Sequence, residues 1–428
     1  MTETINLSSQ IQKQLPAELA DFMEKASDIA QIQSQKLYLV GGVVRDLLLG
    51  KKIFDSDLVI EGNAIELAQR LNSYYEGKIT THSQFGTAKL QWGKWSIDLT
   101  TARSETYAKP GALPEVRADS IKDDLFRRDF TINAMAISLV QGQYGELIDL
   151  YGGKDDLKHK SIRILHENSF IDDATRIWRA LRYEQRLDFQ IEKSTLRLLK
   201  RDVPLLDTIS GDRIRYELEC VLREKFPEKT ICRADELEIL AKLHPSLKGN
   251  GWLAEKFERI RRTSPPNAQT TELYLALLIY RMPPTDVEYL ISHLRPPKPL
   301  TQTLRHTVSL KAKLETLATP GLVPSSIYRL LRGYSPAAIT VNAIACVSPI
   351  AAEHLQLFLS KLRYTNPTLT GNDLQDTGIP RGPKIKRILG LLHEARLDGK
   401  VSDKKEEVEL VQRWLHKPNR NQTQGAID

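Results

Sequence analysis

Cysteine is scarce in this sequence of 428 residues, which contains only Cys220, Cys232 and Cys346. Three cysteines cannot form a complete set of disulfides, and their spacing matches no metal-binding pattern, so a reducing, cytoplasmic location is expected. Long hydrophobic runs are absent as well. The two most apolar stretches, Leu273–Tyr280 and Ala343–Ala352, are much shorter than the roughly 20 residues of a membrane helix, so we expect no membrane partner.

No signal peptide is expected, because the first 36 residues are rich in Gln, Ser and acidic residues with only scattered apolar positions. The excess of positive over negative charge is small, because the sequence has 61 Lys and Arg and 54 Asp and Glu, which gives a net charge of +7. This modest basic excess fits RNA binding and is also found in basic proteins that bind no RNA. The length allows two to four domains.

A pair of glycines follows a short apolar segment near residue 40. Residues Tyr38–Val40 are predicted to form a buried strand, and Gly41 and Gly42 allow a sharp turn and the close approach of a ligand. Residues Val43–Leu49 are predicted to form a helix whose N-terminus favours phosphate groups, and Arg45 adds a fixed cation. No G-x-G-x-x-G follows the strand, so a dinucleotide-binding fold is not indicated.

Two aspartates follow this turn closely. Asp55 and Asp57 lie two residues apart in a predicted strand, Phe54–Ile60, so their side chains point to the same face. Two carboxylates on one face suit Mg²⁺, which usually binds one or two carboxylates together with substrate phosphates. A phosphate-binding turn beside a metal site predicts nucleotidyl transfer.

Three blocks of sequence resemble the motifs of one family. The blocks Gly41–Asp57, Arg127–Ala134 and Asp172–Arg182 resemble, in that order, the catalytic, ribose-reading and base-reading motifs of the class II tRNA nucleotidyltransferase and bacterial poly(A) polymerase family. The resemblance spans roughly residues 37–189. It implies an α+β fold with a polymerase-β-like, mixed α/β nucleotidyltransferase head, followed by an all-helical neck, body and tail.

The domains expected from this resemblance follow one another along the chain. They are an N-terminal extension (1–36), the head with the metal site (37–155), a neck with the base-reading motif (156–225), a body (226–365) and a tail that contacts tRNA (366–428). The sequence predicts neither the role of the extension nor the oligomeric state.

The ribose-reading block places two polar residues four positions apart. On a helix, Asp129 and Asn133 share a face and could hold a ribose by its hydroxyls, with Phe130 on the buried side. As an alternative, Asp129 caps this element or pairs with Arg128. The flanking motifs favour the ribose role, and the resemblance adds Arg128 to the nucleotide-binding residues.

The base-reading block makes the sharpest chemical prediction. On one helical face, Asp173 could accept a hydrogen bond from an exocyclic amine and Arg176 could donate one to a ring nitrogen. Cytosine and adenine present this edge, whereas guanine and uracil leave both groups unpaired, at about 1–3 kcal/mol each. The alternative is an ordinary surface ion pair between Asp173 and Arg176.

The other charged residues of this block are Asp172, Arg179 and Arg182. The resemblance places Arg179 and Arg182 with the nucleotide, but Arg182 is rotated by about 180° from Asp173 on a straight helix. We therefore assign Arg182 to phosphate, RNA or packing. Asp172 stands where the family has Glu, and its role stays open.

The segment Gly378–Leu389 resembles the tail of bacterial CCA-adding enzymes. Pro383 suits the first turn of a helix. The basic residues expected to meet RNA phosphates there are Arg381, Lys384, Lys386 and Arg387. A solvated, basic helix start is the alternative.

The resemblance also implies the chemistry and the partners. Transfer is expected to be of the two-metal, in-line type with Mg²⁺, from CTP and ATP to the 3′ end of a tRNA held by its acceptor and TΨC arms. Asp98, on the polar face of the predicted strand Trp95–Thr100, is the candidate for drawing a proton from the attacking hydroxyl. Residues Ser104–Lys122 resemble the flexible loop needed for adding the terminal A. Complete CCA addition and A addition alone both stay open, beside a poly(A) polymerase and a non-catalytic RNA-binding module.

Overall fold

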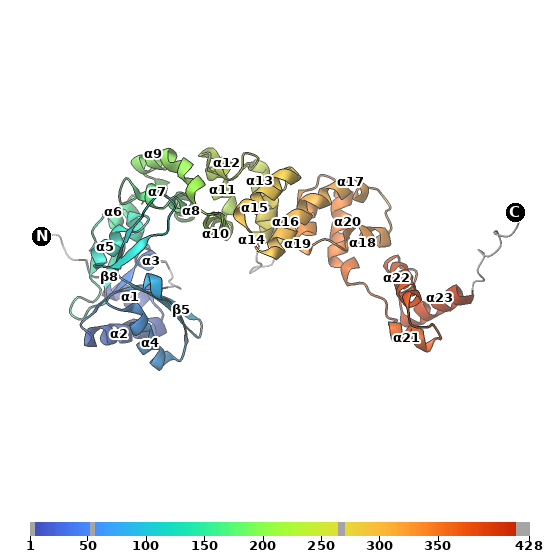
Figure 1. Cartoon of the computed structure of the whole chain (residues 1–428), viewed down its shortest axis with the longest axis horizontal. Helices are drawn as coiled ribbons and strands as arrows, with labels where there is room; N and C mark the ends of the chain where they lie inside the picture. The colour runs from blue at the N-terminus through green and yellow to red at the C-terminus, as the bar shows by residue number, and fades with distance from the viewer. Residues whose placement is uncertain (1–4, 52–55, 264–269, 417–428) are drawn as a thin grey trace. The chain divides into compact units, whose positions relative to one another are not determined.

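The computed structural model describes residues 5–51, 56–263 and 270–416 (Figure 1). Its contacts divide the chain into two compact units, Met1–Pro245 and Ser246–Asp428, and each is described by itself. The finer division at residues 155, 225 and 365 stays a prediction. The predicted α+β class is confirmed, because a mixed sheet lies in the first unit and the described part of the second is helical.

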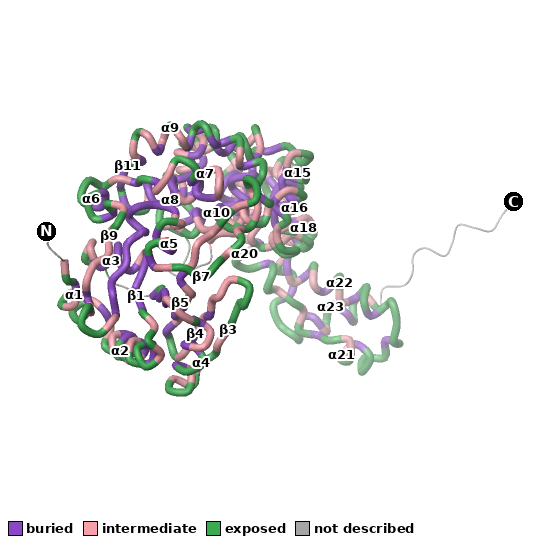
Figure 2. The backbone as a smooth tube through the Cα atoms, turned by 60° about the vertical axis from the view of Figure 1, so that its left-hand side comes forward, coloured by how far each residue is buried: buried purple, intermediate pink, exposed green. Residues whose placement is uncertain are grey.

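The first unit is built on a seven-stranded sheet with the order β3-β4-β5-β2-β1-β8-β9. The strands are β1 (Lys36–Val40), β2 (Ser56–Glu61), β3 (Lys78–His82), β4 (Thr87–Trp92), β5 (Trp95–Thr101), β8 (Met135–Ser138) and β9 (Leu147–Asp149). Strand β1 is apolar and is an inner strand of the sheet, antiparallel to β2 on one side and β8 on the other, and four of its five residues are buried (Figure 2). The glycine turn and helix α3 (Gly42–Leu48) follow β1. The helix begins and ends one residue earlier than predicted.

The expected N-terminal extension belongs to the core of this head. Helices α1 (Ser8–Gln14) and α2 (Ala17–Ile32) precede the sheet, and α2 packs against β1 and α4 (Ala64–Tyr75). The side chains of Leu19 and Phe22 are fully buried. Removal of the segment would therefore expose one face of the sheet.

The pairing of β2 with β5 sets the position of the acidic residues. These two strands run parallel, and the register places Asp57 directly beside Asp98. Neighbouring residues in register project from the same face of a sheet. The chain between them forms α4, η1 (Ser83–Phe85) and the strands β3 and β4.

The segment Ser104–Lys122, expected to be a flexible loop, contains ordered structure. Strands β6 (Arg103–Thr106) and β7 (Glu115–Ala118) form an antiparallel hairpin, and Ser120 caps the following helix α5 (Ile121–Phe126). The rest of the unit is mainly helical: η2 (Thr131–Asn133), α6 (Gly153–Lys158), β10 (Ser161–Ile162), α7 (Ser169–Asp172), α8 (Thr175–Leu187), β11 (Gln190–Ile191), α9 (Lys193–Asp202), η3 (Val203–Thr208), α10 (Gly211–Leu222), α11 (Pro227–Glu236) and α12 (Ile239–Leu243).

The second unit consists of helices in its described residues. They are α13 (Gly251–Thr263), α14 (Thr271–Leu278), α15 (Pro284–Leu294), α16 (Lys298–Leu310), η4 (Lys311–Lys313), α17 (Leu314–Leu317), α18 (Pro324–Leu331), α19 (Pro336–Ala345), α20 (Pro349–Ser360), η5 (Leu362–Tyr364), α21 (Gly371–Asp376), α22 (Pro383–Leu397) and α23 (Lys404–His416). Proline occupies the first turn of several helices, where a missing N–H is tolerated. Within the described ranges, none of the helices has the length and apolar character needed to cross a bilayer.

Candidate active site

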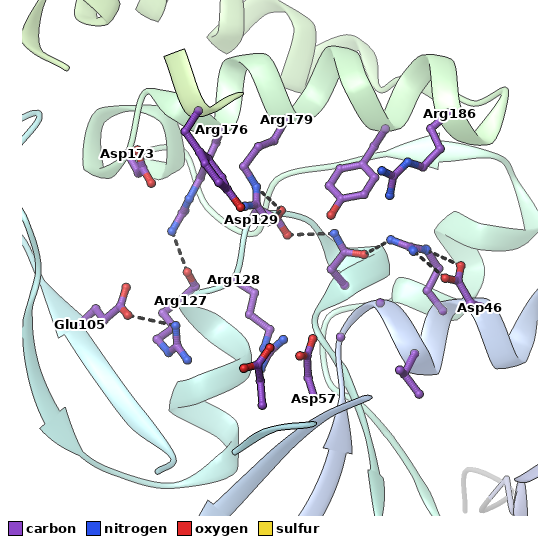
Figure 3. A pocket seen from close by; sticks show the side chains of 18 of the residues that line it. Asp46, Asp57, Glu105, Arg127, Arg128, Asp129, Asp173, Arg176, Arg179 and Arg186 are labelled. Atoms are coloured by element: carbon purple, nitrogen blue, oxygen red, sulfur yellow. Dashed lines mark hydrogen bonds and ion pairs between the residues drawn. The ribbon is translucent and has the colours of Figure 1, made fainter. Parts of the chain in front are cut away.

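A cleft of about 800 Å³ in the first unit gathers residues from all three motif blocks (Figure 3). Its walls come from the turn after β1 and the start of α3, from β2, β4 and β5, from the β6–β7 hairpin, from the segment that follows α5, and from α8 and α10. The residues that line it include Gly41, Gly42, Arg45, Asp46, Asp57, Lys89, Asp98, Glu105, Tyr107, Arg127, Arg128, Asp129, Asn133, Asp173, Arg176 and Arg179.

Two carboxylates lie side by side on the sheet wall of the cleft. Asp57 and Asp98 are register neighbours on β2 and β5, and Lys89 on β4 approaches Asp98 to 3.3 Å. Asp55, the other predicted metal ligand, lies outside the described residues. The part of the chain that the structure describes contains no cluster of three metal-ligating side chains. Two adjacent carboxylates beside a cleft nevertheless fit a divalent cation that takes its remaining ligands from phosphates and water.

The glycine turn requires glycine at Gly41 for two reasons. Its φ of +75° is disfavoured for other residues, and a Cβ there would come within 2.8 Å of Nη1 of Arg128. Arg128 is itself held by Asp124, whose Oδ2 accepts a hydrogen bond of 2.9 Å from Nη2. The guanidinium of Arg128 therefore lies against the turn, where the sequence predicted phosphate groups.

The side chain of Arg45 is almost completely buried and is hydrogen-bonded to other protein side chains. Nη1 of Arg45 donates to Oδ1 of Asn133 at 2.7 Å, and Nε donates to Asp46 at 2.9 Å. Burial lowers the pKa of the guanidinium, but the bond and charge of Asp46 outweigh it and the pKa is raised. Arg45 thus fixes which way the Asn133 amide faces.

The prediction that Asp129 and Asn133 share a helical face is wrong, although the two residues do meet. Phe130 is extended and only Thr131–Asn133 form a short 3₁₀ turn, yet Nδ2 of Asn133 donates to Oδ1 of Asp129 at 3.0 Å. The alternative, a pairing of Asp129 with Arg128, is not formed among the described residues. Instead, Nε and Nη2 of Arg179 donate to Oδ2 of Asp129 at 2.8 and 2.6 Å.

The surroundings of Asp129 stabilise its charged form. Burial raises the pKa of this carboxyl, but the charge of Arg179 and the hydrogen bonds from Asn133 and Arg179 outweigh burial and lower the pKa to about 2. The folded-state pKa is therefore below the ordinary value of 3.8. This stabilisation is complete above pH 4 and is lost as the pH falls toward 2.

Asp129→Asn is expected to lower the free energy of unfolding at pH 7 by about 2 kcal/mol, the equivalent of the pKa shift. The difference between wild type and variant should shrink as the pH falls from 4 to 2, because the wild-type carboxyl then becomes protonated. Urea denaturation at pH 7, 4 and 3 measures this difference. A difference that stays constant over this range would refute the assignment.

Asp173 does not lie on a helix, which corrects the sequence-based geometry. It is an extended residue between α7 and α8, and its Oδ1 accepts hydrogen bonds from the backbone N and Oγ1 of Thr175 at 3.0 and 2.7 Å. A further bond of 2.8 Å to Oδ1 comes from Nη2 of Arg213 on α10. No described residue donates to Oδ2 of Asp173, so this oxygen is available to a ligand.

Arg176 lies in the first turn of α8 and is also held in place. Nη1 donates to Oγ of Ser169 at 2.6 Å. Nη2 donates to the backbone oxygen of Arg127 at 2.7 Å (Figure 3). Among the described residues no ion pair joins Arg176 to Asp173, so the alternative of an ordinary ion pair between them is wrong. Both residues line the cleft.

The remaining residues of this block separate into two groups. Arg179 lines the cleft, whereas Arg182 does not line it and lies 3.7 Å from both Glu217 and Glu224. The packing role considered for Arg182 fits this position. Asp172 lies beside a second, smaller cavity and 3.8 Å from His166.

The β6–β7 hairpin contributes residues whose roles were not predicted. Oε1 of Glu105 accepts a hydrogen bond of 3.0 Å from Nη1 of Arg127, and Oε2 accepts one of 2.9 Å from the hydroxyl of Tyr107. These contacts attach the hairpin to the end of α5. Arg213 was missed as well, and no local sequence pattern connects it with Asp173.

The basic residues predicted for RNA lie in the second unit, at the start of α22. Pro383 is its first residue, as expected. The exposed side chains are those of Arg381, Lys384, Lys386 and Arg387.

Comparisons with known proteins cover most of the chain. Residues 37–163 match the family model of the poly A polymerase head domain, and residues 188–249 match the model described as the probable RNA and SrmB-binding site of polymerase A. An A-adding tRNA nucleotidyltransferase of Geobacter sulfurreducens is 34% identical over 88% of this chain. The chain spans only 45% of the length of that relative.

Two further relatives match over nearly their full length. An A-adding tRNA nucleotidyltransferase of Halalkalibacterium halodurans is 30% identical, with 92% of each chain covered. The solved structure of a CCA-adding enzyme of Thermotoga maritima complexed with tRNA(CCA) is 33% identical, with a TM-score of 0.75, and covers 97% of this chain and 100% of its own.

Proposed function

The chain belongs to the class II family of tRNA nucleotidyltransferases and bacterial poly(A) polymerases, and we propose that it adds the terminal adenosine to the 3′ end of tRNA without a nucleic-acid template. One observation carries this proposal. The acidic pair Asp57 and Asp98 and the base-reading pair Asp173 and Arg176 line the same cleft. The A-adding relatives support ATP as a substrate.

Selection of the base rests on the two groups that remain open in the cleft. Oδ2 of Asp173 accepts from the exocyclic amine of adenine, and the fixed guanidinium of Arg176 donates to the adjacent ring nitrogen. Guanine and uracil present a carbonyl oxygen and a ring N–H in these places, so both protein groups would lose their partners. Cytosine presents the same edge as adenine and also fits.

The reaction is an in-line displacement at the α-phosphate of the nucleotide. A bond forms between the 3′ oxygen of the RNA and the α-phosphorus, and the bond to the β-phosphate oxygen breaks, which releases pyrophosphate. Asp98 takes the proton of the attacking hydroxyl. Arg128, fixed against the glycine turn, binds the phosphates.

A divalent cation, which we propose to be Mg²⁺, would be held by Asp55 and Asp57, with the carboxylate of Asp98 next to Asp57. When bound, it supplies positive charge that stabilises the phosphoryl oxygens and the departing pyrophosphate. The adjacent carboxylates of Asp57 and Asp98 support this assignment.

The tRNA is proposed to be recognised by its shape along the acceptor and TΨC arms. Residues Arg381, Lys384, Lys386 and Arg387 are proposed to contact its backbone phosphates, and their exposure supports this.

Complete CCA addition is the second candidate, because the same pair of side chains accepts cytosine. The test is the incorporation of labelled CTP and ATP into three tRNA transcripts that end at the discriminator base, after one C and after CC. Addition of A to the CC-ended transcript alone supports the first candidate, and addition to all three that stops at CCA supports the second. Long A tails would indicate a poly(A) polymerase, and no incorporation would favour an RNA-binding module.

Gly41→Ala is expected to destabilise the protein by about 1–3 kcal/mol through its positive φ, and to lower kcat/KM for ATP by about tenfold because the new Cβ displaces Arg128. Gly50→Ala is the matched control, since Gly50 also has a positive φ of +66° but no atom within 4 Å of the added Cβ. It should destabilise the protein and leave kcat/KM unchanged. Equal effects of both substitutions on kcat/KM would contradict the role of Arg128.

A further inference from the structure

Arg213 holds the carboxylate through which the base is proposed to be read. It lies on α10, and its Nη2 donates to Oδ1 of Asp173 at 2.8 Å. With the two bonds from Thr175, three donors converge on this one oxygen. Because Asp173 is an extended residue, these contacts fix the direction of Oδ2.

The position of the Arg213 guanidinium lowers the stability of the fold, because one of its donors is buried without a partner. Its Nη1 is buried and has no hydrogen-bond partner among the described residues. Buried donors are rarely left unpaired in proteins, and such exceptions call for an explanation. An arginine selected for stability alone would have both terminal nitrogens paired or exposed.

The charge of Arg213 also keeps the two base-reading groups apart. Asp173 and Arg176 have opposite charges and line the same cleft, yet the described structure contains no ion pair between them. Asp173 is instead paired with Arg213, while Arg176 is bound to Ser169 and to the backbone of Arg127. If Arg213 were removed, Asp173 would lose its ion-pair partner on α10, and its attraction to Arg176 would no longer be opposed.

We propose that Arg213 is a positioning residue that determines base specificity: it holds Asp173 away from Arg176, so that each presents its open hydrogen-bonding group to the base. An Asp173–Arg176 pair that satisfied itself would no longer penalise guanine or uracil. This inference rests on the proposed function of the cleft.

The test is the ratio of kcat/KM for ATP to kcat/KM for GTP, measured on tRNA transcripts that end in CC. Arg213→Met is expected to lower this ratio by about tenfold, because the unmatched base no longer leaves buried groups unpaired. Arg213→Lys, which keeps the charge, should recover most of the ratio. A structural defect alone would lower both kcat/KM values together and leave the ratio unchanged.

Arg215→Met is the matched control. Arg215 lies two residues further along α10, where it pairs with Asp212 at 3.0 Å and Glu219 at 3.5 Å, and it does not line the cleft. Its ratio should equal that of the wild type. If circular dichroism shows that Arg213→Met is unfolded, Arg213→Gln takes its place with the same expected fall.

The outcomes separate the two proposals. A wild-type enzyme that prefers ATP, with an unchanged ratio in the folded Arg213 variant, overturns the role of Arg213 and leaves the proposed function intact. A wild-type protein that incorporates no nucleotide overturns the proposed function, and with it this inference.

Discussion

Asp57→Asn is expected to reduce nucleotide incorporation by about three orders of magnitude while tRNA binding is retained. Asp57 lies directly beside Asp98 in the parallel pairing of β2 and β5. The substitution preserves the shape of the side chain but removes one negative charge from the proposed cation site. The loss of several kcal/mol of transition-state stabilisation corresponds to this reduction in rate.

Incorporation of labelled ATP and the dissociation constant of the tRNA are measured on the same preparation. Asp28→Asn, an identical chemical change at an exposed position of α2, should leave both quantities unchanged. Incorporation within tenfold of the wild type by Asp57→Asn would remove Asp57 from the metal site. Loss of tRNA binding would instead show that the substitution damages the fold.

Asp173→Ala is expected to lower the preference for ATP over GTP and UTP by about ten- to a hundredfold. The variant lacks the acceptor for the exocyclic amine, so adenine loses a hydrogen bond and guanine no longer faces an unpaired carboxylate. The value of kcat/KM for ATP should fall as well, because part of the binding energy is lost. Single-nucleotide addition with each triphosphate separately measures the preference.

The neighbouring residue gives the control for this substitution. Asp172 lies beside the second cavity and does not line the cleft. Asp172→Ala should therefore leave the preference for ATP unchanged. If both variants lose the same amount of selectivity, the effect comes from a disturbed helix start and the assignment of Asp173 fails.

The sequence predicted the parts of the head that depend on local patterns. The apolar run before Gly41 predicted a buried strand, which β1 confirms, and the alternation around Asp98 predicted its polar face, which β5 confirms. Both predictions succeed because strand periodicity is a property of a few adjacent residues. The direct contact of β2 with β5 depends on the crossover through α4, β3 and β4, and sequence spacing contains no information on it.

Two errors have a common physical cause. Asp129 and Asp173 were both placed on helices by their spacing, but Asp129 lies in a bend and Asp173 is extended, and each precedes a helical turn. Aspartate often binds nearby backbone N–H groups in such places, and Asp173 binds the N–H of Thr175. The sequence Asp173-Ala174-Thr175 carries that signal, which the helical interpretation overlooked.

The contacts that hold the site together could not be predicted from local sequence patterns. Arg213 and Arg179 approach aspartates that are distant in the sequence, and the pairs depend on how α8 and α10 pack. Long side chains with several possible partners leave such pairings undetermined until the packing of the helices is known.

We propose that protein side chains in one cleft both select the base and support its transfer. The most direct measurement is the incorporation of each of the four labelled triphosphates, supplied separately with Mg²⁺, into a tRNA transcript that ends in CC. We expect addition of a single A, with GTP and UTP used at least about a hundredfold less efficiently. Comparable incorporation of all four nucleotides, or of none, would contradict it.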